Sequence, residues 1–233
     1  DAGTFLRSLF ALRHYFTAVA RAGAAGAPFT VLRDHGIAAE AAMRAATAGI
    51  NTHRGAIFSL GLLVAAAAGC RRVHGHAVSG AQVCLAVQQW KDALIAAPLD
   101  PHSPGQRARA RHGVCGVREQ AAAGYPVLRE LALPALRHAL DSGLPRDAAL
   151  CQTLMQLVAQ VDDLNLLHRG GTEGLRWAQQ QAATFLSAGG AFAPDWRMRL
   201  QSIGDAFVRR RLSPGGSADL LACAWFLLQQ EGA

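Results

Sequence analysis

The chain has 233 residues, of which 51% are hydrophobic and 6% are aromatic, and it carries a formal net charge of +7. This length is enough for one large domain or two small ones, and a composition rich in alanine and leucine favours helices. Nearly all basic side chains are arginine, which suits an anionic partner such as a phosphorylated small molecule. The basic residues are scattered and do not alternate with aromatic residues, which argues against nucleic-acid binding.

Helical periodicity runs through most of the chain. Apolar residues from Phe5 to Val19 recur at intervals of three and four, which predicts a first helix over 3–22, and Pro28 is a candidate first residue of a helix. We expect an all-α fold, with a single compact domain over 1–233 made of about ten helices with short connections. The later predicted helices span 37–48, 55–69, 80–97, 118–123, 126–141, 146–167, 172–188, 195–211 and 216–230.

One stretch, 98–116, is rich in proline and glycine and is the clearest irregular segment. Its arginines, Arg107, Arg109 and Arg111, predict a short basic helix within a loop.

The cysteines and the apolar runs indicate the cellular compartment of the protein. Five cysteines without metal-ligand spacing are typical of reduced thiols in a cytoplasmic protein. The longest apolar run, 56–69, is too short to span a bilayer, and no signal-peptide pattern is present. We therefore expect a cytoplasmic protein with neither a membrane nor a nucleic-acid partner. Because the chain begins at Asp1, we also expect that an N-terminal segment is missing.

Four polar clusters stand beside glycines and apolar helices, and the first is Asn51-Thr52-His53-Arg54-Gly55. Thr52 is a candidate N-cap for the helix that follows, and free amides at a helix N-terminus favour an anion. Arg54 and His53 would add hydrogen-bond donors. A capped helix with a solvated arginine is the alternative interpretation.

The second cluster is Arg118-Glu119, which follows two glycines that allow close backbone approach, Gly113 and Gly116. A surface ion pair at the start of a helix is the more favoured interpretation of this pair taken alone.

The third cluster, 162–171, ends in the pair Gly170-Gly171, which predicts a helix end. Asp162, Asn165 and Arg169 are three and four residues apart, so we expect them on one helix face. The two aspartates, Asp162 and Asp163, together with Asn165 offer the hard oxygen ligands that Mg²⁺ accepts. A solvated pair of aspartates is the alternative.

The fourth cluster, 213–219, places Ser213, Gly215, Gly216 and Ser217 before an apolar helix. Bare backbone amides in this position predict a phosphate cradle. Asp219 in the first turn either complements the helix dipole or holds a magnesium ion that a phosphate also contacts. The Walker spacing is absent.

These clusters carry a family resemblance. The segments GINTHRGAIFSLGLL, GVCGVREQAAAGYP, DDLNLLHRGG and SPGGSADLLA occur in this order in the triphosphoribosyl-dephospho-coenzyme A synthases, which the chain resembles over about residues 4–230. The branch that serves malonate decarboxylase is more similar than the branch that serves citrate lyase. Members usually carry an upstream Pro-Lys-Pro-Gly-Leu-Val-Asp signature, and this sequence starts after that point.

The resemblance implies ATP and 3′-dephospho-coenzyme A as substrates. The 2′-hydroxyl of dephospho-coenzyme A attacks the anomeric carbon of the ATP ribose, adenine leaves, and the triphosphate stays on the sugar. The product is the precursor of the prosthetic group of an acyl-carrier protein subunit. A homodimer is a candidate assembly, and the sequence leaves the oligomeric state open. A non-catalytic nucleotide-binding module and a magnesium-dependent ADP-ribosyl-type hydrolase are the alternative functions.

The site residues expected for this chemistry come from all four clusters. Glu119, Asp162 and Asp163 are the expected catalytic residues, with Glu119 the first candidate general base. Mg²⁺ is the expected cofactor, bound by Asp162, Asp163, Asn165 and Asp219. The residues expected to bind the triphosphate are Asn51, Thr52, His53, Arg54, Gly55, Arg118, His168, Arg169, Ser213, Gly215, Gly216 and Ser217.

Overall fold

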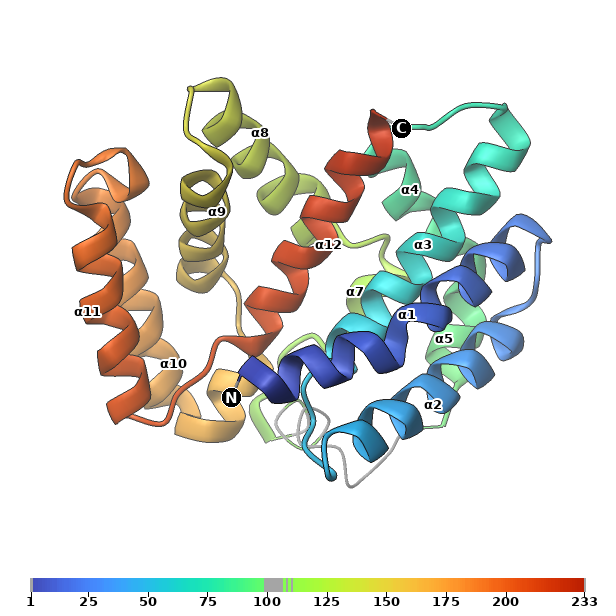
Figure 1. The fold of residues 1–233 in the computed structure, drawn as a ribbon, viewed down its shortest axis with the longest axis horizontal. Coiled ribbons are helices and arrows are strands. Elements are labelled where there is room, and N and C mark those ends of the chain that lie inside the picture. The colour runs from blue at the N-terminus through green and yellow to red at the C-terminus, as the bar shows by residue number, and fades with distance from the viewer. Residues whose placement is uncertain (1, 99–106, 108, 110, 233) are drawn as a thin grey trace. The chain divides into compact units, whose positions relative to one another are not determined.

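The computed structural model describes residues 2–98, 107, 109 and 111–232, and these residues contain helices and no strand (Figure 1). The prediction of an all-α fold is therefore confirmed. By its contacts the chain divides into two compact units, which are described separately below. The assignment of 1–233 to one domain stays a prediction. The first unit comprises Asp1–Ala97, Val117–Tyr125 and Phe226–Ala233, and the second comprises Pro98–Gly116 and Pro126–Trp225.

The first unit is built on three long helices that pack against one another, α1 (Ala2–Ala24), α2 (Phe29–Ala46) and α3 (Arg54–His74). The contact between α1 and α3 is close, because a Cβ at Gly61 would overlap the Tyr15 hydroxyl group, which donates to the Ile57 carbonyl at 2.8 Å. The shorter elements of this unit are α4 (Gly80–Ala86), the 3₁₀ turn η1 (Val87–Trp90), α5 (Lys91–Ala96) and α7 (Val117–Ala122).

Helix α3 is long and apolar enough to cross a membrane by length and composition alone, the one such helix among the described residues. It continues past the predicted 55–69 to His74, which makes it longer than the apolar run. Leu62, Leu63, Ala65 and Ala66 are nevertheless buried within the unit. Their burial gives the apolar composition a packing reason.

The second unit has its core around α9 (Arg146–Gln160) and α10 (Leu164–Ser187), which pack side by side. Leu166, Ala178, Phe185 and Phe207 belong to one buried cluster there. The π-helical turn η2 (Leu128–Ala132) leads into α8 (Leu133–Asp141), and the 3₁₀ turn η3 (Gly190–Phe192) leads to α11 (Trp196–Arg209). Helix α12 (Gly215–Glu231) begins in this unit, and the last part of it belongs to the first unit.

Several predicted helix boundaries were wrong. The second helix begins at Phe29 instead of 37, and Pro28 is its N-cap. The predicted helix 80–97 is α4, η1 and α5 in succession. The predicted helix 146–167 is interrupted, because Val161 is extended (φ −97°, ψ 137°) and α10 starts only at Leu164. The segment 98–116 lies largely outside the described residues, although Arg107, Arg109 and Arg111 have helical backbone.

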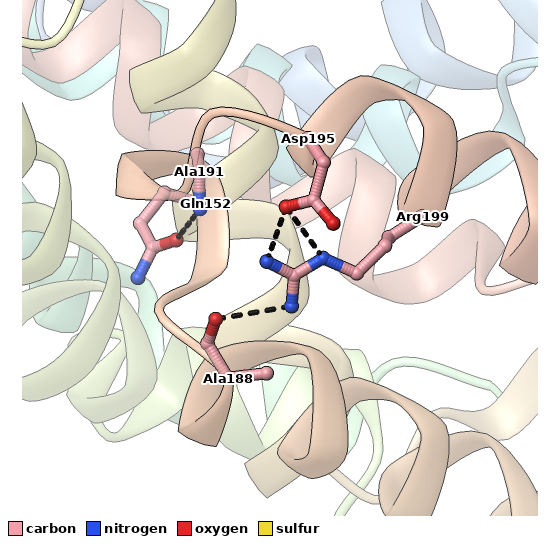
Figure 2. A network of polar contacts seen from close by, with 5 residues as sticks. All are labelled: Gln152, Ala188, Ala191, Asp195 and Arg199. Atoms are coloured by element: carbon pink, nitrogen blue, oxygen red, sulfur yellow. Dashed lines mark hydrogen bonds and ion pairs between the residues drawn. The ribbon is translucent and has the colours of Figure 1, made fainter.

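A polar network ties the connection between α10 and α11 to α9 (Figure 2). Gln152, which is 8% exposed, accepts a hydrogen bond from the amide of Ala191 at 2.8 Å. Arg199 donates to Asp195 at 2.6 and 3.0 Å and to the carbonyl of Ala188 at 3.0 Å. The buried glutamine therefore satisfies a backbone donor that the turn alone leaves open.

We expect Gln152→Leu to lower the free energy of unfolding by about 1–3 kcal/mol, because the buried amide of Ala191 loses its acceptor. Urea denaturation followed by circular dichroism measures this change. Gln160→Leu, an exposed position on the same helix, is the matched control and should change the value by less than about 0.5 kcal/mol. Equal effects of the two substitutions would contradict the role of Gln152.

Candidate functional site

The carboxylate of Asp163 joins the start of α10 to the start of α12. Asp163 is 1% exposed and is the N-cap of α10. Its Oδ1 accepts from the amides of Asn165 at 2.8 Å and Leu166 at 3.3 Å. Its Oδ2 accepts from the amide and the hydroxyl of Ser217 at 2.7 and 2.9 Å. Four donors therefore fill the four acceptor positions of this buried carboxylate.

The third and fourth predicted clusters thus meet within the second unit, but their chemistry differs from the prediction. Ser217 was expected to offer its amide to a phosphate, and this amide instead binds Asp163. A Cβ at Gly216 would lie 3.2 Å from the Asp163 carboxyl group, and a Cβ at Gly215 would overlap the side-chain amide of Asn165. Close packing between the two helix starts therefore accounts for both glycines.

The two adjacent aspartates have different environments. Asp162 lies before the N-cap of α10 and is exposed, so the prediction that it shares a helix face with Asn165 and Arg169 is wrong. The physical reason is that Asp163 caps the helix, so that α10 begins at Leu164 and Asp162 lies outside it. Across the described part of the chain, no hydrogen bond or ion pair to protein holds the Asp162 carboxylate.

The pair Gly170-Gly171 separates two helical segments of α10, which confirms the predicted helix end at this pair. Gly171 has φ 60° and ψ −162°, which only glycine adopts readily, and the second segment continues to Ser187. His168 and Arg169 are exposed on the segment before this kink.

The predicted magnesium ligands lie in different environments. The oxygens of Asp163 are all occupied by protein donors. Among the described residues, no group of three or more histidine, cysteine, aspartate or glutamate side chains has the proximity to hold a metal ion. Asp162 is exposed and Asp219 is half-buried in the first turns of α12. Magnesium binding by Asp162, Asn165 and Asp219 stays a prediction, whereas the oxygens of Asp163 are used by the protein.

The first predicted cluster lies in the first unit, around a buried serine. Ser8 is fully buried, accepts from Thr52 at 2.8 Å and lies 2.7 Å from Nδ1 of His53. Nδ1 also lies 3.1 Å from the hydroxyl oxygen of Thr52, so the two hydroxyl groups together orient the imidazole ring. The ring of Phe5 packs edge-on against the imidazole, and burial lowers the pKa of His53. His53 is therefore a neutral hydrogen-bond donor near pH 7.

The capping of α3 differs from the prediction. The N-cap of α3 is His53, whose side chain makes no cap hydrogen bond. The side-chain oxygen of Asn51 accepts from the amide of Arg54 at 3.1 Å, whereas Thr52 donates to Ser8. Arg54 is paired with Glu40 at 3.2 Å and is not a solvated arginine. Gly55 is half-buried in the first turn of α3. This cluster therefore fixes the start of α3 against α1 and α2.

The second predicted cluster is also in the first unit. Nη1 of Arg118 donates to the Ala97 carbonyl at 2.5 Å, which joins α7 to the end of α5. Glu119 is half-buried in the first turn of α7. No contact tests its predicted role as a base, and that role stays a prediction. Ser213 is half-buried ahead of α12.

A cavity of about 250 Å³ opens beside Asp162 within the second unit. Thr172, Arg176 and Gln179 line it, and the search for polar clusters missed these residues because they resemble an exposed helix face. Their spacing of four and three residues was the signal, since it places them on one face.

Asp162, just before the capped start of α10, thus lies at an open cavity, and concave sites with a few polar groups are where proteins bind small molecules. The family model described as ATP:dephospho-CoA triphosphoribosyl transferase matches residues 1–233, and the chain belongs to this family. It is accordingly an enzyme of the transferase class.

Curated relatives carry the name "probable 2-(5″-triphosphoribosyl)-3′-dephosphocoenzyme-A synthase". The protein from Citrobacter koseri is 42% identical over 85% of this chain and 67% of its own length. The proteins from Acinetobacter calcoaceticus and Vibrio cholerae are 36% and 35% identical, over 99% and 98% of this chain and 80% and 77% of their own lengths.

A crystal structure from Archaeoglobus fulgidus, described as a triphosphoribosyl-dephospho-CoA synthase, has the same fold. The TM-score is 0.61 at 15% identity, over 96% of this chain and 99% of that chain.

We expect Asp163→Asn to lower the free energy of unfolding by at least about 2 kcal/mol, because an amide cannot accept from all four donors of a buried carboxylate. The matched control is Asp162→Asn, whose carboxylate is exposed and should contribute little to stability. Thermal denaturation of both variants compares their losses of stability. If Asp162→Asn were the more destabilised, the capping role of Asp163 would be refuted.

We expect the pKa of His53 to lie below the ordinary value of about 6.5, because burial disfavours the charged ring. The unfolded chain then takes up this proton first, so that stability contributed by His53 falls as the pH drops from about 6.5 towards the folded pKa. NMR titration of the imidazole, assigned with His53→Gln, measures the pKa directly. A value at or above 6.5 would show that the ring is not desolvated.

Proposed function

We propose that the chain transfers the 5-triphosphoribosyl group of ATP to the 2′-hydroxyl of 3′-dephospho-coenzyme A, with release of adenine. The observation that carries the proposal is the family match over residues 1–233, together with relatives of 35–42% identity that bear the synthase name. Substrates are taken from these names, and the residues below are assigned from their chemistry in this structure.

In the proposed reaction one bond breaks and one forms at the same carbon. The bond between the anomeric carbon of the ATP ribose and adenine N9 breaks, and the oxygen of the 2′-hydroxyl bonds to that carbon. The hydroxyl proton passes to a base, while adenine leaves with the bonding electron pair and takes up a proton. Positive charge develops on the sugar during this exchange, and a nearby carboxylate stabilises it.

Asp162 is the carboxylate that we assign to this sugar. It is exposed beside a cavity, and no protein donor occupies its oxygens within the described residues. Asp163, by contrast, is buried and fully hydrogen-bonded, so we assign it to holding Asp162 in place. Glu119 stays a candidate general base.

Mg²⁺ is proposed to enter as part of the substrate, as the magnesium complex of ATP. Among the described residues, no group of three or more histidine, cysteine, aspartate or glutamate side chains is close enough to bind a metal ion. Mg²⁺ generally prefers substrate phosphates together with one or two carboxylates, which supports this proposal. Asp162 and Asp219 are the candidate carboxylates. His53 is proposed to bind a phosphate oxygen as a neutral donor, since burial lowers the pKa of its ring.

The product is proposed to serve the acyl-carrier protein subunit of malonate decarboxylase in the cytoplasm, with the citrate lyase subunit as the alternative. The support for the malonate branch is the resemblance of the four sequence segments to that branch. A homodimer stays a prediction.

We expect Asp162→Ala to lower kcat for adenine release by about 100-fold or more, because a charge-stabilising or proton-transferring carboxylate is lost. Chromatography measures adenine and the triphosphoribosyl product after incubation with ATP, Mg²⁺ and dephospho-coenzyme A. The helical circular dichroism signal and the thermal midpoint should stay unchanged. Asp205→Ala, an exposed aspartate on α11 in the same unit, is the control and should keep full activity.

Full turnover by the Asp162→Ala variant would show that Asp162 has no role in the reaction. Adenine release by the wild-type chain without dephospho-coenzyme A would instead indicate a hydrolase, and no release under either condition would refute the proposed function.

A further inference from the structure

The cavity beside Asp162 has a wall formed by one face of α10. Thr172, Leu175, Arg176 and Gln179 line the cavity and follow one another at intervals of three, one and three residues. On a helix such positions share a face. The kink at Gly171 starts this segment in a new direction, and Leu167 from the segment before the kink also lines the cavity.

The lining suits a ligand with apolar faces and polar edges. Leu167 and Leu175 are 4% and 5% exposed and form an apolar wall together with Val114. Asp162 and Arg176 contribute opposite formal charges that cancel, and His112 adds a further polar ring to the lining. A triphosphate, which needs several positive charges, is therefore a poor match for this cavity, whereas a neutral ring with donors and acceptors on its edge is a good match.

The size of the cavity limits the ligand further. Its volume is about 250 Å³. Pockets that enclose a drug-sized ligand have volumes of about 300–1,000 Å³. The cavity is therefore suited to one ring system rather than to a whole nucleotide, whose sugar and phosphates would lie outside it.

The side-chain amide of Gln179 provides the recognition group. Its Nε2 donates to the carbonyl of Val161 at 3.4 Å, which orients the amide. Within the described residues, no protein partner occupies the Oε1 oxygen or the second N–H of this amide, so both can bind a ligand. Glutamine pairs with the N6 and N7 atoms of adenine through one such acceptor and one such donor. Arg176 on the same face can stack its planar guanidinium on an aromatic ring.

We propose that this cavity binds the adenine ring of an adenine nucleotide, with Gln179 hydrogen-bonded to the N6 and N7 edge and with Leu167 and Leu175 against the ring face. The choice of an adenine nucleotide rests on the proposed function, in which both substrates contain adenine. The position of Asp162 at the cavity places its carboxylate beside the sugar that such a base carries.

The test compares Gln179→Leu with Gln180→Leu in the full chain. Gln180 is the exposed neighbour on the same helix and does not line the cavity. Calorimetry measures binding of ATP, dephospho-coenzyme A and adenosine separately, and of inosine triphosphate, in which an oxygen replaces the N6 amino group. Thermal denaturation checks that both variants are folded.

We expect Gln179→Leu to weaken binding of at least one adenine substrate roughly 10- to 100-fold and to abolish the preference for ATP or adenosine over the inosine compound. Gln180→Leu should change neither. The substrate whose affinity falls is the one whose base occupies the cavity. A merely structural role of Gln179 would lower all affinities without changing the adenine preference, and that result would overturn the proposal.

The outcomes separate this proposal from the proposed function. Unchanged affinity and selectivity in Gln179→Leu, with normal adenine release by the wild-type chain, would overturn the adenine cavity and leave the transferase reaction standing. Selective adenosine binding that depends on Gln179, without turnover of ATP, would support the cavity and refute the reaction. If wild-type protein bound no adenine compound, the cavity proposal would be refuted.

Discussion

The second unit depends on one buried carboxylate that caps two helices at once. Asp163 receives two amides at the start of α10 and two donors of Ser217 at the start of α12. A buried charge is stable only when it is fully hydrogen-bonded, and here every acceptor position has a donor. The carboxylate thus provides the negative charge that a helix N-terminus favours, at the place where a bound phosphate was expected.

This capping arrangement determines how the neighbouring groups are available to a ligand. Because Asp163 is buried by its donors, the adjacent Asp162 is left outside the helix with its oxygens exposed beside the cavity. In the first unit the hydroxyl of Ser8 has a comparable function, since it orients the ring of His53. In both units, a buried polar residue therefore fixes the position of a neighbouring side chain that a ligand can reach.

The sequence predicted the helical class and most helix centres, because each helix buries an apolar stripe with the expected period. It did not predict the break at Val161, since the Asp163 carboxylate that caps α10 is also held by Ser217, which follows Asp163 by 54 residues. It assigned the cap of α3 to Thr52, although the N-cap is His53 and the hydroxyl of Thr52 instead donates to Ser8 from α1. The cavity face with Gln179 was missed because only the kink at Gly171 distinguishes it from an exposed helix surface.

The kink at Gly171 also affects the order in which this unit can fold. It leaves Leu164 to Gly170 as a short segment, and an isolated helix of this length is not stable in water. Its helicity depends on the cap from Asp163 and on Leu212, whose side chain packs so closely on Gly170 that a Cβ there would lie 2.6 Å away. During synthesis on the ribosome, this segment therefore becomes stably helical only after later residues, such as Leu212, have been synthesised.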